Sequence, residues 1–363
     1  MQALCCASSH AHARRMRSRR GKGAAAALAF PPPPLADEEV LAWTPRASPR
    51  REQAPPHQRN MLILPGFGNA AEDYASGPVV DQVAVEGTDQ RRVDACLAAS
   101  LRRRGFHVAV LPVARSDWLK VVAALLSPNG FANCCTVHDG YRRARRRQAL
   151  SRADPVARRW YLDLVHAAVG ELTEATGQEV VLVGHSAGGW LARGYVGDEL
   201  YGATATQPAP GVRAIVTLGS PHRSPPPGVF DVTRGCRTWL NDRTGGAHYP
   251  SIRYVSVAGR TVRGSCAPTA TLSRPVRLAS QSYAHLRGEA IEGVYGDGVV
   301  PLECALLPGS RQVLLDGVYH AMSSQQTYDQ GGGKVWYGND SVVDAWLGPL
   351  LLEELPVSLR TAR

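Results

Sequence analysis

One serine of this chain stands in a context that can make it a nucleophile. Ser186 lies in the segment Gly184–Gly189 (GHSAGG), directly after an apolar run and before a helical pattern at 190–196. Glycine at 184 and 188 permits a sharp strand-to-helix turn, because a side chain there would collide with the adjoining strand and helix. The N-terminal amides of a helix that begins here would also point toward a developing negative charge. The pattern therefore predicts Ser186 as a nucleophile.

A serine hydroxyl reacts readily only when a base removes its proton and a third group orients that base. On a sheet that carries its serine at such a turn, the acid and then the histidine follow the serine along the chain. Asp297 lies in the glycine-flanked turn Gly296–Gly298, and His320 follows the last apolar strand pattern. We therefore predict Asp297 as the acid and His320 as the base.

Other residues compete for these two roles. Asp316 is close to His320 in sequence, but a turn at a strand end already explains its Asp-Gly pair. His222 follows the fourth predicted strand and is a candidate for lining the pocket. His248 and His285 lie in loop or inserted regions, where we expect surface residues. His320 ranks first among the histidines.

Acyl transfer also needs a site for the oxyanion, which two backbone amides can provide. The residue after the nucleophile, Ala187, would supply one amide. The second is expected from Leu64–Asn69, where Gly66 and Gly68 let the backbone turn so that the Phe67 amide points inward. We find no His, Cys and Asp cluster with metal-ligand spacing, and this chemistry requires no metal or other cofactor.

Short apolar strands alternate with amphipathic segments from residue 60 onward, which predicts an α/β fold. Six runs are rich in Val, Ile and Leu at successive positions, as buried parallel strands are. They are Met61–Leu64, His107–Pro112, Val180–Val183, Val212–Leu218, Ile252–Val257 and Gln312–Leu315. We predict a mostly parallel sheet of about six strands with helices on both faces.

Apolar residues at steps of three and four predict helices between these strands. One covers 93–101 and is stopped by Gly105, and a second runs from an Asp154-Pro155 cap to Gly177. A third begins near Asp340, which could cap it. The stretches 114–153 and 261–295 fit no sheet element, so we expect cap insertions there, over the site at the carboxyl ends of the strands.

The first 59 residues differ in composition from the rest. Residues 1–36 are rich in Arg, Ala and Ser and lack Asp and Glu, which is typical of a transit peptide. We therefore expect a plastid (chloroplast) location, with mitochondrion and cytoplasm as alternatives. Residues 37–59 are rich in Pro and predicted as a linker, so the folded domain is expected at 60–363.

The net charge of +10 is concentrated in a few segments of the chain. Much of the excess lies in 1–36 and in an arginine run at 142–159, and no nucleic-acid motif accompanies it, so we predict no nucleic-acid partner. No apolar run is long enough to span a bilayer, so any membrane contact would be peripheral. The irregular spacing of eight cysteines favours free thiols over a bridge such as Cys236 to Cys266.

Five motifs together resemble the lipase branch of the α/β-hydrolase superfamily. They are LPGFG at 64–68, GHSAGG at 184–189, TLGSPH at 217–222, GDGVVP at 296–301 and GVYH at 317–320. The resemblance extends over about 60–352. Within the branch, the chain is similar to triacylglycerol lipases, to GPI inositol-deacylase-like proteins and above all to plant lipase-like hydrolases. It implies the α/β-hydrolase fold, a Ser186, Asp297 and His320 triad, and Phe67 and Ala187 as oxyanion donors. The opening strands of larger members are not visible before Asn60, which suggests a trimmed core.

These observations predict a serine hydrolase that cleaves a carboxylic ester, with a lipid acyl ester or smaller ester as substrate. An acyltransferase that uses the same acyl-enzyme is one alternative, and a non-catalytic binding scaffold is another. The headgroup, the acyl length, the behaviour of a lid and the oligomeric state stay open.

Overall fold

The structure is a computed structural model. It describes residues 41–43, 59–75, 96–120, 160–226, 229, 233, 235–288, 291–320 and 335–352. The chain divides into two compact units, Met1–Ala36 and Asp37–Arg363, and all of the described residues belong to the second. The predicted transit peptide, the arginine run at 142–159, the Asp154-Pro155 cap and most of the insertion at 114–153 lie outside the described residues.

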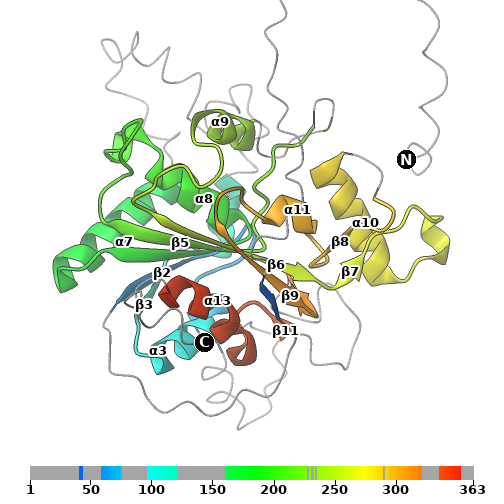
Figure 1. Ribbon diagram of the computed structural model, residues 1–363, viewed down its shortest axis with the longest axis horizontal. Helices are drawn as coiled ribbons and strands as arrows, with labels where there is room; N and C mark the ends of the chain where they lie inside the picture. The colour runs from blue at the N-terminus through cyan, green and yellow to red at the C-terminus, as the bar shows by residue number, and fades with distance from the viewer. Residues whose placement is uncertain are drawn as a thin grey trace, which may run out of the picture. The chain divides into compact units, whose positions relative to one another are not determined.

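A seven-stranded parallel sheet forms the centre of the second unit (Figure 1). Its strand order is β1-β9-β6-β5-β4-β2-β3, and every neighbouring pair is parallel. The strands are β1 (Leu41–Trp43), β2 (Asn60–Leu64), β3 (His107–Val110), β4 (Val180–His185), β5 (Val212–Leu218), β6 (Arg253–Arg260) and β9 (Arg311–Asp316). All six predicted strands are present, which confirms the predicted fold class.

The seventh strand lies in a segment that we predicted as linker. Leu41–Trp43 pairs in parallel with Val313–Leu315 at the edge of the sheet. The interpretation of 37–59 as linker throughout, with no strand before Asn60, is therefore wrong. Three residues are too few for an alternating pattern to stand out from Pro-rich surroundings.

Helices cover both faces of the sheet. One face carries α7 (Trp160–Thr176) and α8 (Ala187–Val196), and the other carries α3 (Leu97–Arg103) and α13 (Asp340–Leu352). Successive residues of a strand point to opposite faces. Met61 and Ile63 accordingly pack into the core beneath α3 and α13, whereas Leu62 and Leu64 pack beneath α7 and α8. Because both faces are covered, β2 and β4 are buried at every position.

Helix α13 begins at Asp340, whose carboxylate joins the two helices of its face. It accepts hydrogen bonds from Ser100 Oγ at 2.6 Å and from Arg104 Nη1 at 2.6 Å. Burial alone would raise the pKa of Asp340, but the hydrogen bonds from Arg104, Ser100 and Arg103 hold it at about 2. The carboxylate therefore ties α13 to α3, while the amides of Val342 and Val343 donate to the Asn339 carbonyl.

The predicted insertion at 261–295 leaves the carboxyl end of β6 and returns next to Asp297. It contains β7 (Val262–Arg263), α10 (Arg274–Arg287) and β8 (Tyr295–Gly296), with β7 and β8 antiparallel. Tyr283 of α10 is fully buried, and its hydroxyl donates to the Val262 carbonyl and accepts from the Gly298 amide, each at 3.0 Å. The insertion thus supports the turn that carries Asp297. Its role as a cap stays a prediction.

The remaining described elements are short. They are α1 (Glu72–Ala75), η1 (Arg115–Trp118), η2 (Glu199–Tyr201), α9 (Cys236–Arg243), η3 (Thr269–Thr271), α11 (Leu302–Ala305), β10 (Val318–Tyr319) and β11 (Val335–Trp336). Cys96, Cys266 and Cys304 are free, whereas Cys236 is disulfide-bonded, so the preference for free thiols is wrong at Cys236. The alternative bridge to Cys266 is excluded. Among the described helices, none combines the length and the apolar composition that crossing a membrane requires.

Candidate active site

Ser186 stands at the turn between β4 and α8 in an unusual backbone conformation. Its φ is 51° and its ψ is −120°, and among the described residues no other non-glycine has a positive φ. Such a conformation costs an L-residue about 1–3 kcal/mol, so the surroundings must hold it in place. The Ser186 amide donates to the Leu218 carbonyl at 2.9 Å, and its carbonyl accepts from Gly189 at 3.1 Å. The side chain itself is half-buried and remains accessible.

The glycines around Ser186 are required by close packing. A Cβ at Gly184 would lie 2.4 Å from the Gly189 Cα, and one at Gly188 would lie 2.2 Å from the Leu64 carbonyl oxygen. A Cβ at Gly189 would lie 1.9 Å from the Ser220 Oγ. Real Cβ atoms do not come this close to other heavy atoms. The strand, the helix and the end of β2 therefore converge on the serine, as the glycine spacing predicted.

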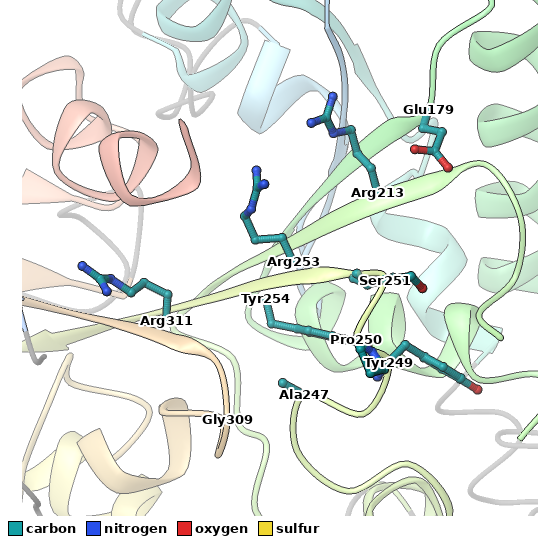
Figure 2. A pocket seen from close by; sticks show the side chains of 11 residues that line it. Glu179, Arg213, Ala247, Tyr249, Pro250, Ser251, Arg253, Tyr254, Gly309 and Arg311 are labelled. Atoms are coloured by element: carbon teal, nitrogen blue, oxygen red, sulfur yellow. Dashed lines mark hydrogen bonds between the residues drawn. The ribbon is translucent and has the colours of Figure 1, made fainter. Parts of the chain in front are cut away.

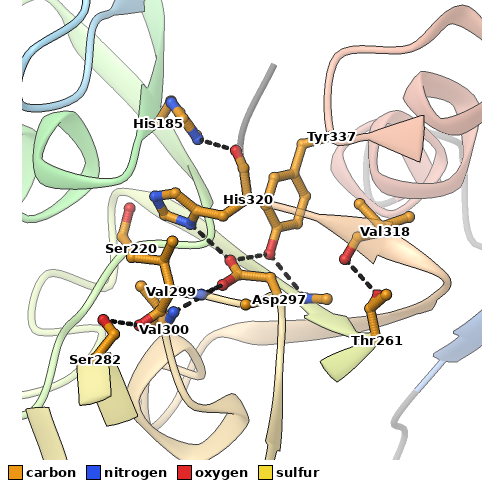
Figure 3. A network of polar contacts seen from close by, with 12 residues as sticks. His185, Ser220, Thr261, Ser282, Asp297, Val299, Val300, Val318, His320 and Tyr337 are labelled. Carbon is orange, nitrogen blue, oxygen red and sulfur yellow. Dashed lines mark hydrogen bonds and ion pairs between the residues drawn. The ribbon is translucent and has the colours of Figure 1, made fainter. Parts of the chain in front are cut away.

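Asp297 and His320 are brought together at the carboxyl ends of β6 and β9 (Figure 3). His320 Nδ1 donates to Asp297 Oδ2 at 2.7 Å, and the His320 amide donates to the Asp297 carbonyl at 3.0 Å. The other carboxylate oxygen accepts from the amides of Val299 at 3.0 Å and Val300 at 2.7 Å. Nδ1 is thus occupied, which leaves Nε2 of His320 to act as a base.

The electrostatics keep this carboxyl ionised although it is fully buried. Burial alone would raise the pKa of Asp297, but the His320 imidazole and the hydrogen bonds from His320, Val300 and Val299 outweigh it, and the pKa lies below its ordinary value. A carboxylate that accepts several hydrogen bonds is commonly shifted in this way. The negative charge can therefore stabilise an imidazolium on His320.

A fourth donor to the carboxylate was missed by the sequence analysis. The Tyr337 hydroxyl donates to Asp297 Oδ2 at 2.8 Å and accepts from the Gly259 amide at 2.8 Å (Figure 3). Tyr337 is fully buried, and burial together with the nearby Asp297 charge raises its pKa well above the ordinary value. The phenol therefore stays protonated. Its position just after the short strand β11 offered no sequence signal for this role.

No hydrogen bond joins the side chains of Ser186 and His320 in the described part of the chain. The His320 ring centre lies 4.8 Å from that of His185, the residue that precedes Ser186. Catalytic hydrogen bonds are often long in the absence of substrate and shorten in the reacting complex. The arrangement places Ser186, His320 and Asp297 at one edge of the sheet, and their catalytic roles stay predictions.

The loop after β2 lies against Ser186. A Cβ at Gly66 would lie 2.9 Å from the Ser186 Cβ. Within the described residues, the amides of Phe67 and Ala187 donate to no acceptor of the protein. Both amides that we predicted for the oxyanion are thus available next to the serine.

Several side chains fix this loop in position. Tyr161 donates to the Pro65 carbonyl at 2.8 Å, and the Trp118 indole donates to the Asn69 carbonyl at 2.8 Å. Arg115 donates to the Gly68 carbonyl at 3.1 Å and pairs with the buried Asp73. Three carbonyls of the loop are thus held by side chains, which restrains its backbone.

The competing residues serve other purposes. His222 is fully buried and bonded to Thr217 Oγ1 at 3.0 Å, and burial followed by the charge of Arg193 lowers its pKa well below the ordinary value. Asp316 forms an ion pair with Arg260. His248 and His285 are half-buried. No group of three or more His, Cys, Asp or Glu among the described residues could hold a metal ion.

A cavity of about 600 Å³ lies at the other edge of the sheet (Figure 2). Arg213, Arg253 and Arg311, which stand near the starts of β5, β6 and β9, contribute to its lining. Ser186 follows the carboxyl end of β4, whereas this cavity lies where the strands begin. It therefore belongs to no part of the candidate site.

The contacts of Gly189 predict that a single methyl group will damage the turn. Gly189→Ala should lower the free energy of unfolding by at least about 2 kcal/mol, because the new Cβ overlaps Ser220 Oγ. Urea denaturation would measure the loss. Adding Ser220→Gly should restore part of it, since that change removes the two nearest atoms. Gly170→Ala in α7, where no atom lies within 4 Å, is the matched control and should be neutral or slightly stabilising.

The Tyr337 contact predicts a change in the pH dependence of stability. A carboxyl whose pKa is lowered by folding stabilises the fold above its unfolded pKa, and this stabilisation is lost as the pH falls through the folded pKa. Tyr337→Phe removes one donor, so the pKa of Asp297 should rise and the acid loss of stability should begin at higher pH. Unfolding measured between about pH 3 and 7 would show it.

Tyr249→Phe provides the control for this experiment. Its hydroxyl donates to the neutral Thr204 carbonyl at 3.0 Å and serves no carboxylate. That variant should lose stability by the same amount at every pH below the range where tyrosine ionises. Parallel pH profiles for Tyr337→Phe and the wild type would contradict the assignment of Tyr337 as a donor to an ionised Asp297.

Comparisons with known proteins found one matching family model and several similar solved structures. Residues 160–259 match the model of the PGAP1-like alpha/beta domain family. No curated protein matches the chain in sequence. Among solved structures, the mature form of Bacillus licheniformis lipase BlEst2 is similar at 13% identity and a TM-score of 0.39, over 85% of this chain and 96% of that one. The metagenomic carboxyl esterase MGS0156 is similar at 16% identity and a TM-score of 0.44, over 85% and 80%. The stretch that matches the PGAP1-like alpha/beta domain family contains β4, the strained turn at Ser186 and α8, so the chain is similar to that family in the part that carries the candidate site.

Proposed function

We propose that this protein is a carboxylic-ester hydrolase that forms an acyl-enzyme on Ser186. The observation that carries the proposal is the strained turn of Ser186 beside a histidine whose Nδ1 is bonded to a buried carboxylate. An α/β-hydrolase fold of the lipase and esterase type supports ester hydrolysis in general. The additional assignment of Ser186, His320 and Asp297 to a triad rests on the geometry of this site.

The proposed reaction has two balanced halves. His320 Nε2 accepts the proton of Ser186 Oγ as Oγ attacks the acyl carbonyl, and the leaving alkoxide takes that proton from His320 to depart as the alcohol. Water then repeats the sequence: it gives a proton to His320, attacks the acyl-enzyme, and the carboxylic acid leaves as Ser186 regains its proton. The amides of Phe67 and Ala187 would hold the oxyanion in each half.

The buried charge of Asp297 supports both proton transfers. A carboxylate that accepts the Nδ1 proton fixes the tautomer, so Nε2 carries the lone pair that takes the serine proton. It also stabilises the imidazolium that forms in each half-reaction. Because the amides of Val299 and Val300 and the Tyr337 hydroxyl hold the carboxylate, it cannot turn away from His320.

Apolar side chains beside the oxyanion loop favour a substrate with an apolar acyl chain. The Phe67 side chain is 57% exposed and its ring lies 5.2 Å from that of Trp118, edge to face. Leu119 is 65% exposed on the same segment as Trp118. Because these exposed apolar side chains belong to or adjoin the loop of the Phe67 amide, they could cover an apolar chain bound there, and a lipid acyl ester is the proposed substrate. Peripheral membrane contact and the plastid location remain predictions from the sequence.

The proposal predicts covalent labelling at one residue. A fluorophosphonate probe should label the wild type, while Ser186→Ala should not be labelled and should lose hydrolysis of a p-nitrophenyl ester by at least about 10⁴-fold. Mass spectrometry of the labelled peptide gives the site. Ser220→Ala is the matched control, because Ser220 is also buried against the turn but has no triad role. A folded wild type that resists the probe would sink the proposal.

The acyl-chain assignment makes a separate prediction at Phe67. Phe67→Ala keeps the backbone amide but removes the exposed ring, so KM for a long-chain p-nitrophenyl ester should rise about tenfold with kcat nearly unchanged. KM for the acetate ester should change less than about twofold. Leu200→Ala, at another exposed apolar residue, should alter neither value. Equal effects on long and short esters would argue against an acyl contact at Phe67.

A further inference from the structure

A second histidine lies at the site, and both of its ring nitrogens are occupied. His185 precedes the nucleophile and is buried, with Nδ1 2.8 Å from the Tyr74 hydroxyl and Nε2 3.1 Å from the His320 carbonyl oxygen (Figure 3 shows the second contact). A carbonyl only accepts, so the contact assigns the proton to Nε2. Nδ1 is then an acceptor, and the Tyr74 hydroxyl donates to it.

Tyr74 carries this connection to the oxyanion loop. Its hydroxyl accepts from the Gly66 amide at 3.0 Å and from Asn69 Nδ2 at 2.9 Å, which fills both lone pairs while its proton goes to His185. Gly66 and Asn69 lie on either side of Phe67. Burial raises the pKa of Tyr74, so the phenol keeps the proton that this arrangement requires.

The contacts form one continuous chain of hydrogen bonds across the nucleophile turn. It runs from the Gly66 amide through Tyr74 and His185 to the carbonyl of His320. We propose that His185 and Tyr74 are positioning residues that set the distance between the oxyanion loop and the loop of the catalytic base. This inference rests on the proposed hydrolase function, and neither side chain is assigned a contact with substrate.

A histidine suits this place for a physical reason. Its two ring nitrogens point in different directions, so one neutral side chain can accept from one loop and donate to the other. Burial and the neighbouring His320 lower the pKa of His185 to about 3, which keeps it neutral beside the base. The ring also packs edge to face against Tyr74 and Trp336, with centroids 5.9 and 5.6 Å away. Its orientation is therefore fixed by packing as well as by hydrogen bonds.

Matched substitutions at residue 185 can separate the two connections. His185→Asn keeps an acceptor near Nδ1 and loses the donor to His320, whereas His185→Gln keeps a donor near Nε2 and loses the acceptor for Tyr74. His185→Leu loses both, and Tyr74→Phe removes only the bonds on the oxyanion side. The measurements are kcat and KM for a p-nitrophenyl ester, the rate of fluorophosphonate labelling, and the melting temperature of each full-length variant.

The proposal predicts a specific pattern of kinetic losses. His185→Leu should lower kcat and the labelling rate about a hundredfold, with KM within about twofold, because the reacting groups move apart while binding is retained. Asn and Gln at 185 should each recover part of that loss. Adding Tyr74→Phe to His185→Gln should lower kcat little further, since both changes break the hydrogen bond between residues 74 and 185. Adding it to His185→Asn should cost about as much as Tyr74→Phe alone does in the wild type.

Three results would overturn the inference while the proposed function stands. One is a labelled wild type with a His185→Leu variant whose kcat stays within about twofold. Another is a loss of kcat that is the same in His185→Asn, His185→Gln and His185→Leu and that equals the loss of folded protein in each. Failure of the proposed function shows differently, as a folded wild type that is not labelled. The third result comes from hydrogen exchange, which does not depend on activity. Unchanged amide exchange at 64–69 and 316–320 in His185→Leu would also overturn the positioning role.

Discussion

The positive φ of Ser186 is the constraint to which the rest of the site is fitted. An L-residue adopts it only at a cost of about 1–3 kcal/mol, and it turns the chain from β4 into α8 within one residue. The turn is tight: a Cβ added at Gly184, Gly188 or Gly189 would lie less than 3 Å from backbone or side-chain atoms. The strain is offset by the burial of β4 in both cores and of α8 in one of them.

The same tightness brings the other functional groups to the serine. Parallel strands end at one edge of a sheet, so the loops after β2, β4, β6 and β9 meet there. A buried carboxylate at this edge requires donors in place of water, and Asp297 obtains them from its own turn, from His320 and from Tyr337. The insertion between β6 and Asp297 contributes through Tyr283, which holds the Gly298 amide.

How much of this the sequence could predict depends on the range of each signal. Ser186 stands in a local pattern of strand, glycines and helix, and six strands carry unbroken apolar runs, so both were predictable. Asp297 and His320 were predicted from chain order, and the structure brings them into contact, while their catalytic roles stay predictions. The contacts of Tyr337 and Tyr74 were not predictable, because their partners Asp297 and His185 lie 40 and 111 residues away. The sequence does not distinguish these two tyrosines from other buried tyrosines. Strand β1 was missed because three residues are too few for a local pattern. Its place in the sheet depends on its long-range pairing with β9.

The two histidines at the site show that surroundings rather than residue type assign their roles. Their ring centres are 4.8 Å apart, yet His320 faces a carboxylate and His185 faces a phenol and a carbonyl. Burial and the neighbouring His320 lower the pKa of His185, whose Nδ1 already accepts from Tyr74, so the His185 ring stays neutral. His185 is therefore unsuited to act as a base. In the proposed reaction the proton of Ser186 goes to His320, and the neutral ring of His185 is left to hold the backbone on which His320 stands.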